Sequence, residues 1–173
     1  EARELFQYID AKMWEVVEHN PIMLLEQVTF QRFRELEKDP VFTRMMDTTY
    51  EKFTRYLKER ETLSQPLVAY FSMEYGLHDS LKIFSGGLGV LAGDYLKEAS
   101  DSKVSLVGIG LLYRFGYFRQ TINMYGEQMA NYIPEHFSKI PVQPTYNAHG
   151  EWLTIEVEYP GRNLKAHVWE VNV

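Results

Sequence analysis

The chain has 173 residues, of which 45% are hydrophobic and 14% aromatic, so it can bury a core and wholesale disorder is excluded. Its formal net charge of −6 offers no basic excess for a phosphate backbone, so we predict no nucleic-acid partner, although a local anion site is still allowed. The absence of cysteine excludes disulfides, thiolate nucleophiles and Cys-ligated zinc, and it is compatible with the cytoplasmic location that we predict.

No segment approaches the roughly 18 uninterrupted apolar residues of a membrane span, and the charged, amphipathic start of the chain is unlike a secretory signal. We therefore predict no membrane partner. The chain begins without Met and ends inside an alternating apolar segment, so we expect it to be part of a longer polypeptide.

Residues 1–61 have helical periodicity, with apolar residues at steps of three and four. Asn20 before Pro21 and Asp39 before Pro40 are capping residues followed by a proline in the first turn of a helix. This pattern predicts three helices, at about residues 2–19, 21–38 and 41–60. We interpret them as a packing layer without chemistry of its own.

A strand, a helix and a second strand are predicted after this helical region. Leu67–Phe71 is a short apolar run that fits a strand buried on both faces, as in a parallel sheet. A helix is expected from about Gly89 to Ser102, and a second buried strand from Val104 to Ile109. A right-handed βαβ unit is the simplest assembly of these elements.

The C-terminal third of the chain has a different pattern of apolar and polar residues. The stretch "QTINMYGEQMANYIPEHFSKI" is polar and weakly periodic, and we expect irregular structure or a short helix there. The segments "WLTIEVEY" and "LKAHVWEV" alternate apolar and polar residues around the turn "PGRN", which predicts a β-hairpin, and "NAHG" reads as the turn before it. The predicted class is therefore α/β, with a helical N-terminal layer and an antiparallel excursion.

The stretch "IFSGGLGVLAGDYLKEAS" places Gly86, Gly87 and Gly89 directly before a helix. A helix N-terminus presents unpaired N–H groups and a partial positive charge, and glycine lets an anion approach the backbone closely. The spacing is neither the dinucleotide-binding G-x-G-x-x-G nor the P-loop motif. By spacing alone, a structural turn and a cradle for a phosphate or sugar are about equally supported.

Three other features carry weaker signals. Glu74 follows the first strand, where open α/β sheets bind ligands, but it could equally cap a backbone N–H. His78 and Asp79 are neighbours, yet the five histidines show no ligand spacing, so we predict no metal site. Arg114 and Arg119 lie among aromatic residues, and we favour internal salt bridges for them over contact with a carbohydrate or phosphate.

Two long blocks, "VAYFSMEYGLHDSLKIFSGGLGVLAGDYLKEASD" and "LVGIGLLYRFGYFRQ", occur here in the order found in the α-glucan (glycogen/starch/maltodextrin) phosphorylases. The chain closely resembles the N-terminal part of that family, in its bacterial-type branch. The stretches "HNPIMLLEQVTFQRFRELEKDPVF" and "VEYPGRNLKAHVWEV" extend the resemblance to the whole chain.

The resemblance implies a GT-B glycosyltransferase fold, in which two Rossmann-like domains enclose the active site. Residues 1–61 would be a helical N-terminal region and residues 62–173 a partial Rossmann-like N-terminal domain. The family transfers a terminal glucosyl unit from an α-1,4-glucan to inorganic phosphate, giving glucose 1-phosphate, with pyridoxal phosphate as cofactor. The implied partners are the glucan, phosphate and a C-terminal domain of the same polypeptide, and a homo-oligomer is allowed but not required.

The resemblance also assigns residues. Gly86, Gly87, Leu88 and Gly89 match the family's G-G-L-G loop, which implies that they bind the phosphate and the glucosyl unit, while Glu74 matches a glutamate that supports the site. The family's Schiff-base lysine belongs to the C-terminal domain. We therefore expect this chain to hold no catalytic residue, to be inactive by itself and not to bind the cofactor. Gly76 stands where animal-type members carry a tyrosine near the cofactor.

Two alternatives remain open. A nucleotide-sugar glucosyltransferase of the starch/glycogen synthase type has a similar K-x-G-G-L-G-D loop, but this chain has Ser85 and Val90 where that motif has lysine and aspartate. The other alternative is a non-catalytic carbohydrate-binding module.

Overall fold

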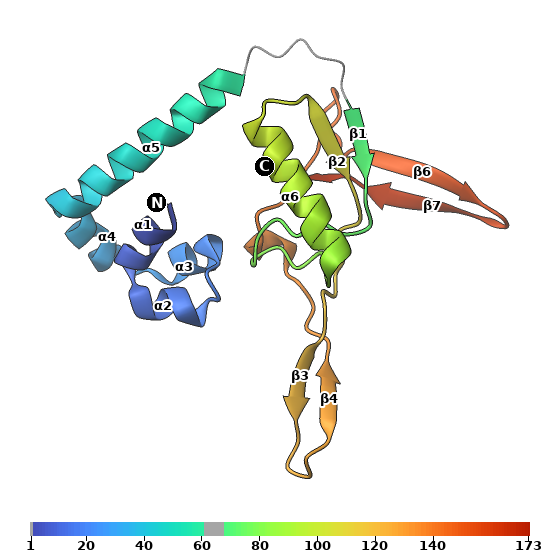
Figure 1. The fold of residues 1–173 in the computed structure, drawn as a ribbon, viewed down its shortest axis with the longest axis horizontal. Helices are drawn as coiled ribbons and strands as arrows, with labels where there is room; N and C mark the ends of the chain where they lie inside the picture. Colours follow the sequence, from blue (N-terminus) through green and yellow to red (C-terminus); the bar gives the residue numbers. More distant parts are fainter. Residues whose placement is uncertain (1, 61–67) are drawn as a thin grey trace.

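The computed structural model describes residues 2–60 and 68–173. It consists of a group of helices, a small α/β unit and two projecting hairpins (Figure 1). The predicted start of the first strand at Leu67 lies outside the described residues.

Within residues 2–60 the structure has five helices, where the sequence predicted three. They are α1 (Ala2–Ile9), α2 (Ala11–Val16), α3 (Pro21–Gln27), α4 (Phe30–Glu37) and α5 (Pro40–Arg60). The prediction was wrong because two further capping residues start new helices: Asp10 accepts a bond from the Met13 N–H at 2.8 Å, and Thr29 accepts one from the Arg32 N–H at 3.2 Å. The caps predicted at Asn20 and Asp39 are confirmed.

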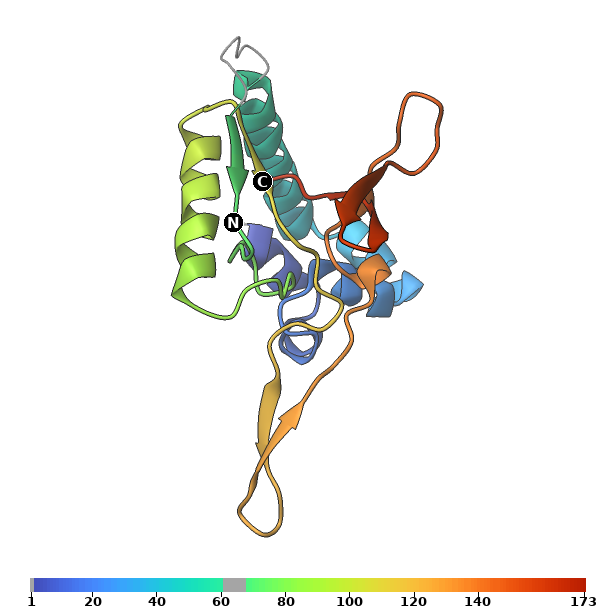
Figure 2. The same cartoon turned by 90° about the vertical axis from the view of Figure 1, so that its right-hand side faces the viewer.

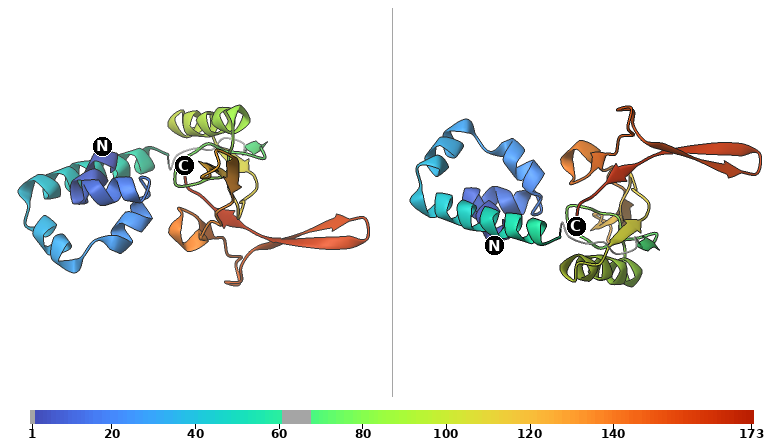
Figure 3. Two further views of the ribbon diagram at one scale, coloured as in Figure 1. Left: turned by 90° about the horizontal axis from the view of Figure 1, so that it is seen from below. Right: turned by 90° about the horizontal axis from the view of Figure 1, so that it is seen from above.

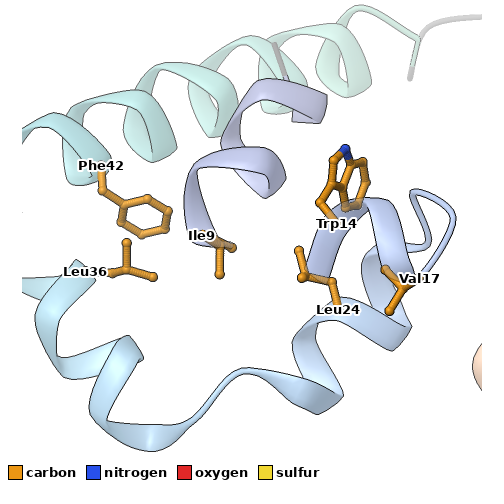
Figure 4. Packing of buried hydrophobic residues seen from close by; sticks show 6 residues of the cluster. All are labelled: Ile9, Trp14, Val17, Leu24, Leu36 and Phe42. Atoms are coloured by element: carbon orange, nitrogen blue, oxygen red, sulfur yellow. The ribbon is translucent and has the colours of Figure 1, made fainter. Parts of the chain in front are cut away.

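The short helices turn their apolar side chains toward one interior (Figure 4). The buried cluster consists of Ile9, Trp14, Val17, Leu24, Leu36 and Phe42. Leu24 is fully buried, and Leu36 is 1% exposed. Because the cluster draws on all five helices, the region has a core of its own.

The predicted strand–helix–strand order is confirmed. The elements are β1 (Val68–Phe71), α6 (Gly87–Asp101) and β2 (Leu106–Ile109), and β1 pairs with β2 in parallel with Val68 opposite Leu106. Figure 2 shows α6 on one side of the two strands. A Cβ atom at Gly93 would lie 2.2 Å from the Gly76 carbonyl oxygen, so glycine there allows α6 to pack directly against the loop after β1.

The prediction that both strands are buried on two faces was wrong for this chain. Phe71 is 71% exposed, and Val107 and Ile109 are 45% and 42% exposed. The described residues supply one helix for a two-stranded sheet, and one helix cannot cover two faces.

A hairpin occupies part of the stretch that was expected to be irregular. It joins β3 (Arg119–Ile122) to β4 (Gln128–Asn131), and it projects from the body of the molecule (Figure 1). All eight strand residues are exposed, so no alternating burial marked these strands in the sequence. The short helix expected nearby is the 3₁₀ turn Phe137–Lys139.

The second hairpin is confirmed, with β6 (Thr154–Tyr159), β7 (Arg162–His167) and a turn at Gly161, where φ is +79°. Figure 3 shows it extending away from helices α1 to α5. At its base, β5 (Gln143–Pro144) pairs with β8 (Trp169–Glu170), and the Trp152 and His167 rings stack with centroids 4.1 Å apart. Within residues 2–60 and 68–173, no helix is both long and apolar enough to cross a membrane.

Candidate functional site

The glycine loop leads directly into α6, which starts at Gly87 rather than at the predicted Gly89. The first bond of the helix runs from the Val90 N–H to the Gly86 carbonyl oxygen at 3.1 Å. The N–H groups of Gly87, Leu88 and Gly89 therefore have no acceptor within the helix. Gly86, Gly87 and Leu88 are exposed, and a Cβ atom at either Gly86 or Gly87 would meet nothing within 4 Å.

Glu74 reaches this helix start from the end of β1. Its Oε1 accepts a hydrogen bond from the Ser85 hydroxyl at 2.9 Å, and its Oε2 accepts one from the Ser85 N–H at 3.2 Å. The hydrogen bond from the Ser85 N–H is the largest cause that lowers the pKa of Glu74, followed by that from the Ser85 hydroxyl. The N–H groups of Gly86 and Gly89 lower it further, whereas burial acts in the opposite direction. Glu74 is thus an anion that caps the loop, the alternative left open by its sequence position.

Gly89 differs from the three residues before it because it is buried against Glu74. A Cβ atom there would lie 2.4 Å from the Phe84 Cβ and 3.1 Å from Glu74 Oε2. Its carbonyl oxygen accepts a bond from the Gly76 N–H at 2.7 Å, and a Cβ on Gly76 would approach that same oxygen to 3.1 Å. Gly76 and Gly89 are small because the loop after β1 and the start of α6 touch there.

Tyr75, the residue after Glu74, anchors this part of the chain. Its side chain is buried, and its hydroxyl donates to the Tyr70 carbonyl oxygen at 2.6 Å and to that of Ile109 at 3.2 Å. Burial raises the pKa of Tyr75, which keeps the hydroxyl protonated as a donor. The Glu74 backbone is therefore held against both strands of the parallel pair.

A pocket of about 270 Å³ opens beside Glu74. Its lining residues come from two segments and from Glu74 itself: Lys82, Ile83, Phe84 and Ser85, and Tyr113, Phe115, Gly116 and Tyr117. The aromatic stretch singled out in the sequence thus lies next to the glycine loop. A separate hollow of about 410 Å³ on α5 is lined by Glu51, Arg55, Lys58 and Glu59, away from the loop.

The two arginines of the aromatic stretch do not line the pocket. Arg119 donates to both carboxylate oxygens of Glu18, as the favoured salt-bridge alternative predicted. Arg114 is exposed and forms no ion pair with another described residue. Neither arginine therefore contributes a guanidinium to the pocket.

His78 takes part in a local turn, where its Nδ1 lies 2.9 Å from the Ser80 hydroxyl and accepts the Ser80 N–H at 3.1 Å. Among the residues that the structure describes, no three His, Asp or Glu side chains converge as metal ligands.

Comparison with known proteins covers the whole chain. A family model described as "Protein of unknown function (DUF3417)" matches residues 1–81. The chain is 37% identical over 180 residues to the maltodextrin phosphorylase of Thermococcus litoralis and 36% identical over 176 residues to the glycogen phosphorylase of Aquifex aeolicus. It is 36% identical over 185 residues to the glycogen phosphorylase of Mycobacterium tuberculosis. Each alignment includes 99% of this chain.

Along almost its whole length the chain is therefore related to glycogen and maltodextrin phosphorylases. It spans 21% to 25% of the length of these phosphorylases. The family model ends before the glycine loop and includes the five helices, β1 and Glu74, whereas the phosphorylase alignments continue through the loop and both hairpins.

Sequence reasoning missed two residues near this candidate site, Lys82 and Glu18. Lys82 lines the pocket, and its Nζ donates to Glu18 Oε2 at 3.1 Å. A lysine and a glutamate 64 positions apart give no local signal, since their meeting depends on how the helices pack against the α/β unit.

Proposed function

We propose that the parent polypeptide is an α-1,4-glucan phosphorylase. It transfers a terminal glucosyl unit from glycogen or maltodextrin to inorganic phosphate and releases glucose 1-phosphate. The observation that carries this proposal is the set of exposed N–H groups at the start of α6, in a chain related to phosphorylases along its whole length.

The loop divides its N–H groups between two tasks. Glu74 accepts a hydrogen bond from the Ser85 N–H, and the N–H groups of Gly86 and Gly89 also lower its pKa. The N–H groups of Gly87 and Leu88 have no acceptor within the helix, and both residues are exposed at the positive end of a 15-residue helix. In the proposal, Gly86 to Gly89 form the phosphate and glucosyl cradle, and these two N–H groups stabilise negative charge on the phosphate during transfer.

Glu74 supports the site without transferring a proton. With its pKa held below the usual range, it stays ionised at neutral pH and lacks a proton to donate. Both oxygens are already bonded to Ser85, so the carboxylate holds the shape of the loop. Its negative charge also repels a phosphate, so the phosphate binds on the far side of the loop, away from the carboxylate.

Pyridoxal phosphate supplies acid–base chemistry through its 5′-phosphate in the proposed enzyme. The pocket of this chain does not fit its Schiff-base site, because Lys82, the lysine in the lining, is bonded to Glu18. We assign no cofactor lysine and no catalytic residue to this chain. It contributes one wall of the site and is inactive by itself.

The same proposal covers the domains. Residues 62–173 begin the Rossmann-like N-terminal domain of a GT-B fold, and residues 1–61 form a helical region in front of it. The parallel pairing of β1 and β2 through α6 supports this division, as does the separate core of the helices. The cleft is completed by a C-terminal domain of the parent polypeptide.

The test is an assay of the full-length parent with maltodextrin and inorganic phosphate. We expect glucose 1-phosphate as product. Activity with ADP-glucose or UDP-glucose alone would overturn the proposal in favour of a nucleotide-sugar glucosyltransferase. The 173-residue chain alone should show no turnover, and calorimetry with maltoheptaose should detect no micromolar binding; such binding would favour a carbohydrate-binding module.

A further inference from the structure

The turn after α2 contains two consecutive residues in the left-handed backbone region. Glu18 has φ of +53° and His19 has φ of +62°. A side chain with a Cβ atom is disfavoured there, and glycine is the usual residue just beyond a helix C-terminus. The chain thus places a glutamate where backbone geometry alone favours glycine, and the carboxylate is the group that a glycine would lack.

The Glu18 carboxylate binds two cations from distant parts of the chain. Lys82 Nζ donates to Oε2 at 3.1 Å, and Arg119 Nη2 donates to both oxygens. The hydrogen bond from Lys82 is the largest of the interactions that lower the pKa of Glu18. Glu18 is therefore ionised at neutral pH. One carboxylate thus joins residues that lie 64 and 101 positions further along the sequence.

Lys82 belongs to one wall of the pocket, and Arg119 lies just beyond the end of the other. The first wall is residues 82–85, which lead into the glycine loop, and the second is residues 113–117, which end two residues before Arg119. The walls touch at Gly116, where a Cβ atom would lie 2.7 Å from the Lys82 carbonyl oxygen. Glu18 therefore ties both walls together from outside the pocket.

We propose that Glu18, in the helical region, is a positioning residue for the glycine-loop site. It sets the relative placement of the two walls and, through residues 82–85, the direction of the loop N–H groups. This inference rests on the proposed phosphorylase function. The ion pairs are half-exposed, with side-chain exposures of 38% for Lys82, 50% for Arg119 and 52% for Glu18. Their contribution to global stability is therefore small, and what they determine is the placement of the two walls.

The chain offers a matched control. Glu26 on α3 pairs with Lys139 at 3.6 Å, and the two side chains are 45% and 43% exposed. This ion pair also joins the helical region to the rest of the molecule, but neither residue lines the pocket. Glu26→Gln thus removes a similar contact without touching the walls.

The experiment compares Glu18→Gln, Glu18→Gly and Glu26→Gln in the full-length parent. We expect both Glu18 variants to lower kcat/KM for phosphate about tenfold, because small displacements of positioned groups are costly to catalysis. The melting temperature should stay unchanged in Glu18→Gln and should not fall in Glu18→Gly, since glycine suits the left-handed position. Glu26→Gln should match the wild type. In a double-mutant cycle, Lys82→Met should add little to Glu18→Gln.

A second readout does not depend on activity. Hydrogen exchange of the peptide that covers residues 82–89 should be faster in Glu18→Gln than in the wild type and unchanged in Glu26→Gln. Equal kcat/KM and equal exchange in the Glu18 and Glu26 variants would overturn the positioning role. A fall in melting temperature parallel to the fall in activity would make Glu18 merely structural. A parent without phosphorolysis but with faster exchange in Glu18→Gln would refute the proposed function and leave the structural link intact.

Discussion

The helical region and the glycine-loop unit are built in different ways. The helices enclose six buried apolar side chains of their own, and the starts of α2 to α5 are capped by side chains two or three residues before the N–H donors. The glycine-loop unit has two parallel strands with exposed faces, and its geometry depends on single contacts such as those of Glu74 and Gly93. The first region has an apolar core of its own, whereas the second leaves the first N–H groups of α6 without an acceptor in the helix.

The largest expected effect tests the core of the helical region. Leu24→Ala removes a fully buried side chain and should lower the free energy of unfolding by about 2–5 kcal/mol. Leu25→Ala, at a neighbouring position that is 42% exposed, should cost about 1 kcal/mol or less. Urea denaturation of the two variants measures the difference. Equal losses would mean that the helices do not form a distinct core.

The second prediction concerns the loop. Gly87→Val adds a branched side chain at the start of α6, where the N–H groups have no acceptor within the helix, and should lower turnover of the full-length parent about 100-fold, as expected when donors to a transition state are blocked. Since a Cβ atom there meets nothing within 4 Å, the melting temperature should not change. Val90→Ala, in the same turn of α6, serves as the control and should retain wild-type kinetics. Unchanged kinetics in Gly87→Val would reduce the loop to a structural turn.

The smallest effect is a pH dependence. Because the folded-state pKa of Glu74 is lowered, its carboxylate contributes stability above its unfolded pKa of about 4.3, and this contribution is lost as the pH falls through the folded value. Glu74→Gln should therefore lose less stability than the wild type between pH 5 and about pH 2. Asp39 and Glu18, whose pKa values are also lowered, titrate in the same range in both proteins.

Urea denaturation across this range gives the difference between the two proteins. Parallel curves for wild type and Glu74→Gln would show that the Ser85 contacts do not favour the ionised form, and they would remove the basis for calling Glu74 a support of the loop.

Local patterns predicted a large part of the fold. The caps at Asn20 and Asp39 and the hairpin at Gly161 depend on residues close together in sequence, and the order of strand, helix and strand follows from the pattern within each segment. The division into five helices was missed because Asp10 and Thr29 lie inside runs that keep helical periodicity. The β3–β4 hairpin was missed because its strands are exposed on both faces and carry no alternating pattern.

By itself, the sequence determined the α/β class, the glycine loop before a helix and the relationship to phosphorylases, because capping, periodicity and motif order are properties of neighbouring residues. Only the tertiary structure decided that Glu74 caps the loop through Ser85, that the aromatic stretch lies beside it and that Glu18 joins Lys82 to Arg119. These contacts join residues from 11 to 101 positions apart, and packing rather than local preference brings them together.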